Sequence, residues 1–176
     1  SATPIPRSLS YAKYGDLDFS EIREKPKERK KIKTIIISEN KIDKLVERIN
    51  FAILNGEKVY WVCPLIEESE RLNLTSVKAR FDFLLKNVPS ISMNFIHGQM
   101  DNDEKNRVIN HFSEGKIKLL VSTTVIEVGM DVVDASIMVI EGAERFGLAQ
   151  LHQLRGRIGR GNKDSTCILI YSSNIS

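Results

Sequence analysis

The chain has 176 residues, of which 41% are hydrophobic and 28% are charged, a composition typical of soluble globular domains. No apolar run approaches the roughly 18 residues that a membrane-spanning helix needs, and no secretory signal is visible, so we expect a cytoplasmic protein with no membrane partner. Cys63 and Cys167 are too far apart to indicate a zinc site or a disulfide framework, and we expect two reduced cysteines buried in strands. The net charge of +3 permits nucleic-acid binding without establishing it.

Residues 1–33 show no sustained period and end in a basic run from Lys25 to Lys33, so we expect an extended arm or linker there. From residue 34 onward, short apolar runs alternate with amphipathic segments. The expected strands cover residues 34–37, 58–63, 91–96, 117–122, 136–140 and 166–171. The expected helices cover residues 39–54, 69–87, 102–112 and 148–154, with a further helical turn near 125–128.

Ser38 and Asp101 are the expected N-caps of the first and third helices, and Gly115 is expected to end the third. In the second helix, the inward face is expected to carry Leu72, Ser76, Ala79 and Phe83. Alternation at βαβ spacing predicts an α/β fold, in which a mostly parallel sheet has helices on both faces. Such strands are buried on both sides, so Tyr60 and Trp61 are expected in the core rather than on a base-stacking surface.

Ligands of parallel sheets gather at the carboxyl ends of the strands, and four expected loops carry polar groups there. We therefore hypothesise one site at a single sheet edge. The four loops contain Glu67-Glu68, His97-Gly98, Thr123 to Asp131, and Gln150 to Gly161.

The segment Arg157-Ile158-Gly159-Arg160 has two arginines three positions apart, which point the same way on a helical turn. Glycines beside them allow a tight turn and the close approach of a bulky anion. Guanidinium groups are always charged and match phosphate geometry, so two of them can stabilise the charge that develops in phosphoryl transfer. The alternative is a basic surface turn paired with acids of the same domain.

Residues 153–160 read Gln-Leu-Arg-Gly-Arg-Ile-Gly-Arg and resemble motif VI of the superfamily 2 helicases, QxxGRxGR. Residues 123–131 resemble motif V, and residues 1–3 resemble motif III, which ends the first motor domain of those enzymes. Residues 1–7 and 147–157 narrow the resemblance to the RecG helicases and the transcription-repair coupling factor Mfd. Residues 15–18 and 62–70 favour the RecG group. Gly142 stands where such proteins often have Asn.

The resemblance implies a RecA-like three-layer sandwich and a nucleotide site shared with another domain. Arg157 and Arg160 would reach the γ-phosphate of ATP, with Arg160 the first candidate for an arginine finger. Gln153 would contact the nucleotide or couple to motifs of the other domain. Gly129 and Asp131 match the pair that faces the ribose, although Asp131 is also suited to capping a turn.

A second set of residues would act on DNA and on interdomain coupling. The implied backbone-phosphate contacts are at Thr123, Thr124, His97 and Gly98, and the implied coupling residues are Ser1 and Thr3. The threonines could instead bond local backbone, and His97 could be a structural loop histidine. We expect no metal site, because no Cys or carboxylate is spaced to join His97 as a ligand.

The chain lacks a GxxxxGK[ST] loop and a DExH-type acidic motif, which the family carries in its first motor domain. We therefore expect that residues 1–33 are a motif III remnant and linker, and that residues 34–176 are the second RecA-like domain, inactive as an ATPase alone. ATP and Mg²⁺ would act in the complete enzyme, whose implied partners are a first motor domain, a wedge domain and branched duplex DNA at stalled forks and Holliday junctions. The alternatives are an Mfd-like translocase that pushes RNA polymerase, and a nucleic-acid-binding module with a decayed motor.

Overall fold

The computed structural model describes residues 31–64, 70–123, 135–159 and 164–172, without the side chains of residues 70–75. The strands are β1 (Ile32–Ser38), β2 (Val59–Cys63), β3 (Met93–Ile96), β4 (Leu119–Thr123), β5 (Ile137–Ile140) and β6 (Ser165–Tyr171). The α-helices are α2 (Ile42–Leu54), α3 (Glu70–Asn87), α4 (Asn102–Ser113) and α5 (Leu148–Arg155), with 3-10 turns η1 (Glu39–Lys41) and η2 (Ala143–Arg145). The expected elements within the described ranges are thus present; the turn near 125–128 lies outside them.

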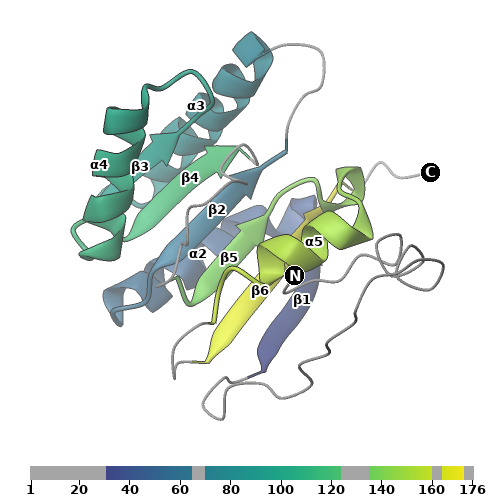
Figure 1. The fold of residues 1–176 in the computed structure, drawn as a ribbon. Helices are drawn as coiled ribbons and strands as arrows, with labels where there is room; N and C mark the ends of the chain where they lie inside the picture. The colour runs from purple at the N-terminus through teal and green to yellow at the C-terminus, as the bar shows by residue number, and fades with distance from the viewer. Residues whose placement is uncertain (1–30, 65–69, 124–134, 160–163, 173–176) are drawn as a thin grey trace, which may run out of the picture.

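All six strands are parallel and lie in the order β1-β6-β5-β2-β4-β3 (Figure 1). Helices α2 and α3 cover one face, and α4 and α5 cover the other. The three-layer α/β fold expected from the sequence is therefore confirmed. Strand β1 begins at Ile32, two residues before the expected start of the domain, because the β-branched run pairs with β6 from that position onward.

The central strands β2 and β4 are buried along their whole length, as an apolar run between two helical layers requires. Trp61 is 0% exposed and Tyr60 is 3% exposed, which confirms their expected place in the core. The two side chains point to opposite faces: Trp61 packs in the cluster under α2 and α3, and Tyr60 in the cluster under α4 and α5. This alternation fixes which face each residue at the sheet edge occupies.

Local sequence signals set the helix ends. The Ser38 hydroxyl accepts a hydrogen bond from the backbone N–H of Asn40, and Asp101 Oδ1 accepts one from Glu104 at 2.7 Å. Gly115 has a φ of +77°, which is the left-handed conformation that ends a helix. All three expected capping positions are confirmed.

The buried face of α3 differs from the expected one in part: Phe83 packs against the core as expected, and the side chain of Leu72 lies outside the described residues. Val77 and Leu84 are fully buried, whereas Ala79 is exposed. The face is set by Val77, Phe81 and Leu84, whose spacing of four and three residues is offset by about 100° from the expected face. Large apolar side chains outweigh Ser76 and Ala79 because they remove more surface from water.

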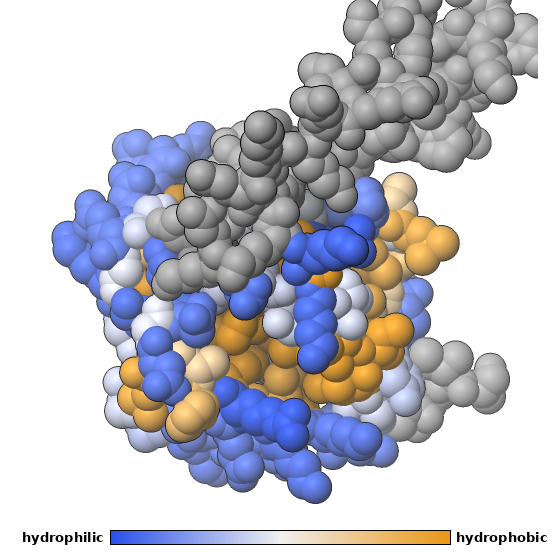
Figure 2. Space-filling view, turned by 90° about the horizontal axis from the view of Figure 1, so that it is seen from below, coloured by the Kyte–Doolittle hydropathy of each residue, from blue (hydrophilic) through white to orange (hydrophobic). Residues whose placement is uncertain are grey.

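Both cysteines are free and buried in strands, as expected. Within the ranges that the structure describes, no helix combines the length and apolar character needed to cross a membrane. Seen from below, apolar side chains form a strip between hydrophilic margins (Figure 2). The exposed large apolar side chains include Ile36 at 67% and Leu148 at 86%.

Candidate functional site

The carboxyl edge of the sheet brings four side chains into one row. Val62 pairs with Ile140, Cys63 with Thr123, and Ile96 with Ser122. The residues at the strand ends therefore follow one another across the sheet in the order Glu141, Cys63, Thr123 and His97. Because alternate positions of a strand face the same side, Thr123 and His97 lie on the α3 face, with Trp61, Val121 and Phe95.

His97 is the first residue after β3 and is half-buried. Its ring stacks on Phe95 with centroids 5.9 Å apart, and Phe95 in turn contacts Phe81 at 5.0 Å. Burial, followed by the charge of Lys78, lowers the pKa of His97 below its usual value. The lowered pKa favours the neutral form of the ring, and its buried Nδ1 makes no hydrogen bond with the described residues.

The Gly98 loop is held by α4. Lys105 Nζ donates to the Gly98 carbonyl at 2.9 Å, and the backbone N–H of Met100 donates to the His97 carbonyl at 3.3 Å. Helix α4 begins beside this loop with its cap at Asp101. The loop is thus fixed from the α4 side while the His97 ring is fixed from the α3 side.

Thr123 ends β4 and is 1% exposed. Its hydroxyl makes no hydrogen bond with any described residue, so the alternative of a local backbone bond at this residue is not seen. A buried hydroxyl without a partner is uncommon, because burial removes its bonds to water. Thr123 and His97 thus place two polar groups, neither bonded to a described residue, at neighbouring positions of one sheet edge.

Helix α5 carries the start of the predicted arginine segment. The side chain of Gln150 accepts from the backbone N–H of Gly147 at 3.1 Å and so closes the first turn. Leu154 and Ile158 are buried against the sheet and anchor the helix and the turn that follows it. Gln153 is exposed and Arg157 is half-buried, so both side chains remain accessible.

The turn after α5 reaches the amino ends of β1 and β6 at Gly159, so the predicted site residues do not all lie at the carboxyl edge, as the single-edge hypothesis had it. Gly159 has a φ of +70°, and a Cβ placed on it would lie 3.1 Å from Ile32 and 3.2 Å from Ser165, the first residues of β1 and β6. The reason is directional: a helix that connects two parallel strands must run back across the sheet (Figure 1). Eight helical residues span about 12 Å, which is close to the length of β5.

Arg157 lies close enough to Tyr60 for its charge to act on the phenol. Burial raises the pKa of Tyr60 to about 12, while Ser122 and Arg157 act in the opposite direction. Ser122 Oγ and Tyr60 Oη are 2.6 Å apart, and both residues are buried on the α5 face. Ser122 precedes Thr123, so neighbouring residues of β4 face the two layers that contain Arg157 and His97.

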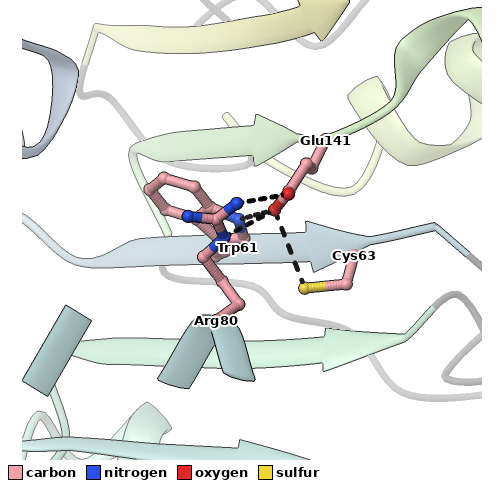
Figure 3. Close-up of polar contacts among 4 residues, drawn as sticks. All are labelled: Trp61, Cys63, Arg80 and Glu141. Atoms are coloured by element: carbon pink, nitrogen blue, oxygen red, sulfur yellow. Dashed lines mark hydrogen bonds and ion pairs between the residues drawn. The ribbon is translucent and has the colours of Figure 1, made fainter. Parts of the chain in front are cut away.

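Glu141 begins the connection from β5 to α5 and forms a polar cluster with Arg80, Trp61 and Cys63 (Figure 3). Arg80 donates to both of its carboxylate oxygens, at 2.9 and 2.5 Å, and Trp61 Nε1 donates to one of them at 3.0 Å. The Arg80 guanidinium lies over the rings of Phe83 and Trp61. Cys63 contacts the same carboxylate at 4.0 Å, and burial, then Glu141, raises the pKa of that thiol.

Gly142 follows this cluster with a φ of +61°, and a Cβ on it would meet Pro64 at 3.1 Å. A residue other than glycine would be strained in this left-handed conformation, and Asn would be strained less than most. The connection from β5 to α5 is thus shaped by backbone conformation as well as by the ion pair.

Six of the predicted site residues lie outside the described ranges: Thr124, Gly129, Asp131, Arg160, Ser1 and Thr3. The structure brings His97, Gly98 and Thr123 together, and it places Gln153 and Arg157 on a different surface. Sequence reasoning did not find Arg80 and Glu141, which are 61 positions apart. The only local signal was an acid directly after a buried strand.

The comparisons with known proteins agree with this geometry. Residues 40–162 match the model of the helicase conserved C-terminal domain. The chain is 47% identical over 171 residues to the ATP-dependent DNA helicase RecG of Thermotoga maritima, and 46% identical over 177 residues to that of Escherichia coli. The two alignments include 97% and 100% of this chain but only 22% and 26% of the relatives. The chain therefore spans about a quarter of the relatives' length.

Solved structures give the same result. A structure of RecG bound to a three-way DNA junction matches 97% of this chain and 22% of that chain, with a TM-score of 0.78 and 43% identity. The C-terminal domain of the DEAD-box protein Dbp5 matches with a TM-score of 0.56 at 21% identity and covers 84% of this chain and 78% of that one, which supports the fold alone. The chain therefore belongs to the helicase conserved C-terminal domain family, and its sequence similarity lies with the RecG helicases.

Proposed function

We propose that this chain acts as the second motor domain of an ATP-dependent helicase that remodels branched DNA in repair and recombination. In this role it supplies an arginine finger and backbone contacts to DNA, and it is inactive as an ATPase without a first motor domain. The observation that carries the proposal is the adjacency of the Thr123 hydroxyl and the His97 ring at the carboxyl edge, with Arg157 in the helical layer on the other face of the sheet. His97 and Thr123 lie at the carboxyl edge, and Arg157 lies beyond the far end of α5.

The surface around Arg157 suits a nucleotide phosphate. The Arg157 guanidinium and the exposed side-chain amide of Gln153 are both hydrogen-bond donors. Ile158, which directly follows Arg157, is fully buried and so fixes the backbone beside it. Arg160 belongs to the same motif and is our first candidate for the finger. ATP, when bound, supplies the phosphoryl group, and its Mg²⁺ would be held by residues of the first motor domain.

The role of these side chains is electrostatic. Arg157 and Arg160 would stabilise negative charge on the transferring phosphoryl group, and Gln153 would orient them or the nucleotide. Gly129 and Asp131 would contact the ribose. Ser1 and Thr3 would couple the two domains. No covalent intermediate on the protein is needed, since positioning and charge stabilisation account for catalysis of this kind.

The carboxyl edge suits a DNA backbone. The Thr123 hydroxyl and the His97 ring have unused hydrogen-bonding capacity, and contacts of this kind position a duplex without reading its sequence. Thr124 and Gly98 would complete the contact. Opening and closing of the two motor domains would then move DNA held at this edge, with a wedge domain separating the strands of a fork or Holliday junction in the cytoplasm near the nucleoid.

Branched DNA is favoured over RNA polymerase as the object of the motor. The relatives at 46–48% identity are named RecG, and one solved relative is bound to a three-way junction. A decayed motor is disfavoured because both motif VI arginines are present in the sequence.

The double variant Arg157→Ala, Arg160→Ala in the complete enzyme tests the proposal. We expect DNA-stimulated ATPase to fall by 10³-fold or more, as for the loss of an arginine finger, and affinity for a three-way junction to stay within about twofold. Arg48→Ala, an exposed arginine of α2 on the opposite face, is the matched control and should change neither quantity. Retention of ATPase by the double variant would show that these arginines do not act on the nucleotide.

A further inference from the structure

His97 lies between two lysines that belong to different helical layers. Lys78 is one helical turn before Phe81 on α3, and Phe81 contacts Phe95, on which the His97 ring stacks. Lys105 is on α4 and bonds the carbonyl of Gly98, the residue after His97, and the charges of both lysines lower the pKa of the ring. Glu104 is the one acid that acts on this ring in the opposite direction. The described charges around His97 therefore sum to a positive value. This positive region lies at the carboxyl end of β3, which is an edge strand of the sheet.

Each lysine has donors to spare. The exposed Lys78 has no ion-pair partner among the described residues. Lys105 is half-buried and uses one N–H on the Gly98 carbonyl at 2.9 Å, which leaves two donors of its ammonium group. That bond also fixes the ammonium beside the loop, so little side-chain entropy remains to be lost on binding an anion.

Two neighbouring polar groups at the same edge have no hydrogen-bond partner within the part of the chain that the structure describes. Thr123 lies beside His97 in the row of strand ends, and its buried hydroxyl makes no hydrogen bond with the described residues. The buried Nδ1 of His97 also has none. Two unused polar groups beside two cations form a set of donors that a single phosphodiester, with its two unesterified oxygens, can satisfy.

The negative end of the row is neutralised within the protein. Glu141 is the only acid in the row, and Arg80 binds both of its oxygens. A phosphate at the Thr123–His97 end therefore meets no free carboxylate along the row itself. Because Arg80 neutralises Glu141, the carboxyl edge carries no net charge in the row at the end of β5 and a positive charge at the end of β3.

We propose that Lys78 and Lys105 bind a backbone phosphate of duplex DNA, one from each side of His97. The inference rests on the proposed function, because it takes the carboxyl edge as the DNA-binding edge. Lys78 and Lys105 add two contacts outside the helicase motifs. The occupant is a phosphodiester of DNA rather than the nucleotide, whose proposed contacts lie at the other end of α5.

The test is the salt dependence of binding of the complete enzyme to a fluorescein-labelled three-way DNA junction. Each phosphate contact that is lost lowers the slope of log K against log salt by about 0.9 for duplex DNA. Lys78→Met and Lys105→Met keep the aliphatic stem and remove the charge. Between 50 and 200 mM salt, the double variant, which loses the one phosphate contact, should therefore lose about 3.5-fold less affinity than the wild type, and each single variant, which keeps one lysine, should lie between the two.

Two lysines provide matched controls. Lys86 is exposed in the last turn of the same helix as Lys78, and Lys116 follows α4 and is paired with Glu114 at 2.7 Å. Both lie toward the amino edge, so Lys86→Met and Lys116→Met should leave the slope unchanged. Equal changes in the controls would reduce the effect to net charge and overturn the proposal.

Two further outcomes would overturn the assignment of one or both lysines. If Lys105→Met weakens binding equally at all salt concentrations, then Lys105 acts only by holding the Gly98 loop, and its assignment is overturned. An unchanged slope in the double variant, with wild-type thermal stability, overturns both contacts. Failure of the arginine assignment is read from a different quantity, the ATPase activity that would survive loss of Arg157 and Arg160, so the two failures are distinguishable.

Discussion

The Arg80–Glu141 pair should stabilise the domain by about 2 kcal/mol, and the structure allows this value to be worked out. Two unit charges about 4 Å apart attract by about 4 kcal/mol at an effective dielectric constant of about 20. Desolvation offsets part of this energy, since the side chains are only 16% and 19% exposed. Exposed pairs, in contrast, contribute about 0.2–1 kcal/mol. The two-point contact and the burial place this pair above that range.

A double-mutant cycle measures the coupling directly. Arg80→Met removes the cation, and Glu141→Gln removes the charge while keeping an oxygen that can accept from Trp61. The free energy of unfolding of the wild type, both single variants and the double variant would be obtained from urea denaturation monitored by Trp61 fluorescence. Each single variant should lose about 2–3 kcal/mol, and the double variant should lose less than the sum by about 2 kcal/mol.

The exposed Lys116–Glu114 pair is the internal standard. Its atoms approach to 2.7 Å, but its side chains are 66% and 53% exposed and screened by solvent, so the same cycle should give a much smaller coupling than for the Arg80–Glu141 pair. Equal couplings for the two pairs would refute the argument that burial and two-point contact determine the strength of the Arg80–Glu141 interaction.

Two further predictions concern backbone conformation and pH. Gly159→Ala should destabilise the domain by about 1 kcal/mol more than Gly56→Ala, because both have positive φ but only Gly159 has close neighbours; urea midpoints that coincide would contradict this. Burial raises the pKa of Cys167 to about 11, so the folded thiol keeps its proton after the unfolded thiol has lost it. Stability should therefore fall between pH 9 and pH 11, by at most about 3 kcal/mol from this group, and the fall should be smaller in Cys167→Ala. An identical pH dependence in that variant would contradict the assignment.

The secondary structure followed closely from the sequence where the local signals were strong. Strands β2 and β4 are nearly continuous apolar runs, and the caps at Ser38 and Asp101 are short-range chemistry that a sequence displays directly. Helix α3 was misphased because Ser76 and Ala79 fit a helical period as well as Val77 and Leu84 do. Packing against the sheet decided between the two faces. That packing depends on residues outside the helix, so the sequence of the helix alone does not determine it.

The site was predictable only in part for the same reason. His97 and Thr123 were expected at a carboxyl edge, and strand pairing places them side by side. Arg157 follows the C-terminal end of α5, and its position depends on the direction in which α5 crosses the sheet between β5 and β6. The motif alone does not show that direction. The contact between Arg80 and Glu141 depends on the strand order, which sets β5 beside β2, and no local pattern encodes that neighbour relation.

The pairing of the first strand with the last has a consequence for how the domain is made. Strand β1 pairs only with β6 within the described sheet, beginning with Ile32 beside Ser165. Roughly 130 residues separate the two, and a ribosome that adds about 5–20 residues per second needs roughly 7–25 s to reach the second strand. Throughout that interval the isoleucine-rich β1 is without its partner in the nascent chain. Completion of the sheet therefore awaits the end of this domain's synthesis, and β1 is the segment most in need of protection from aggregation until then.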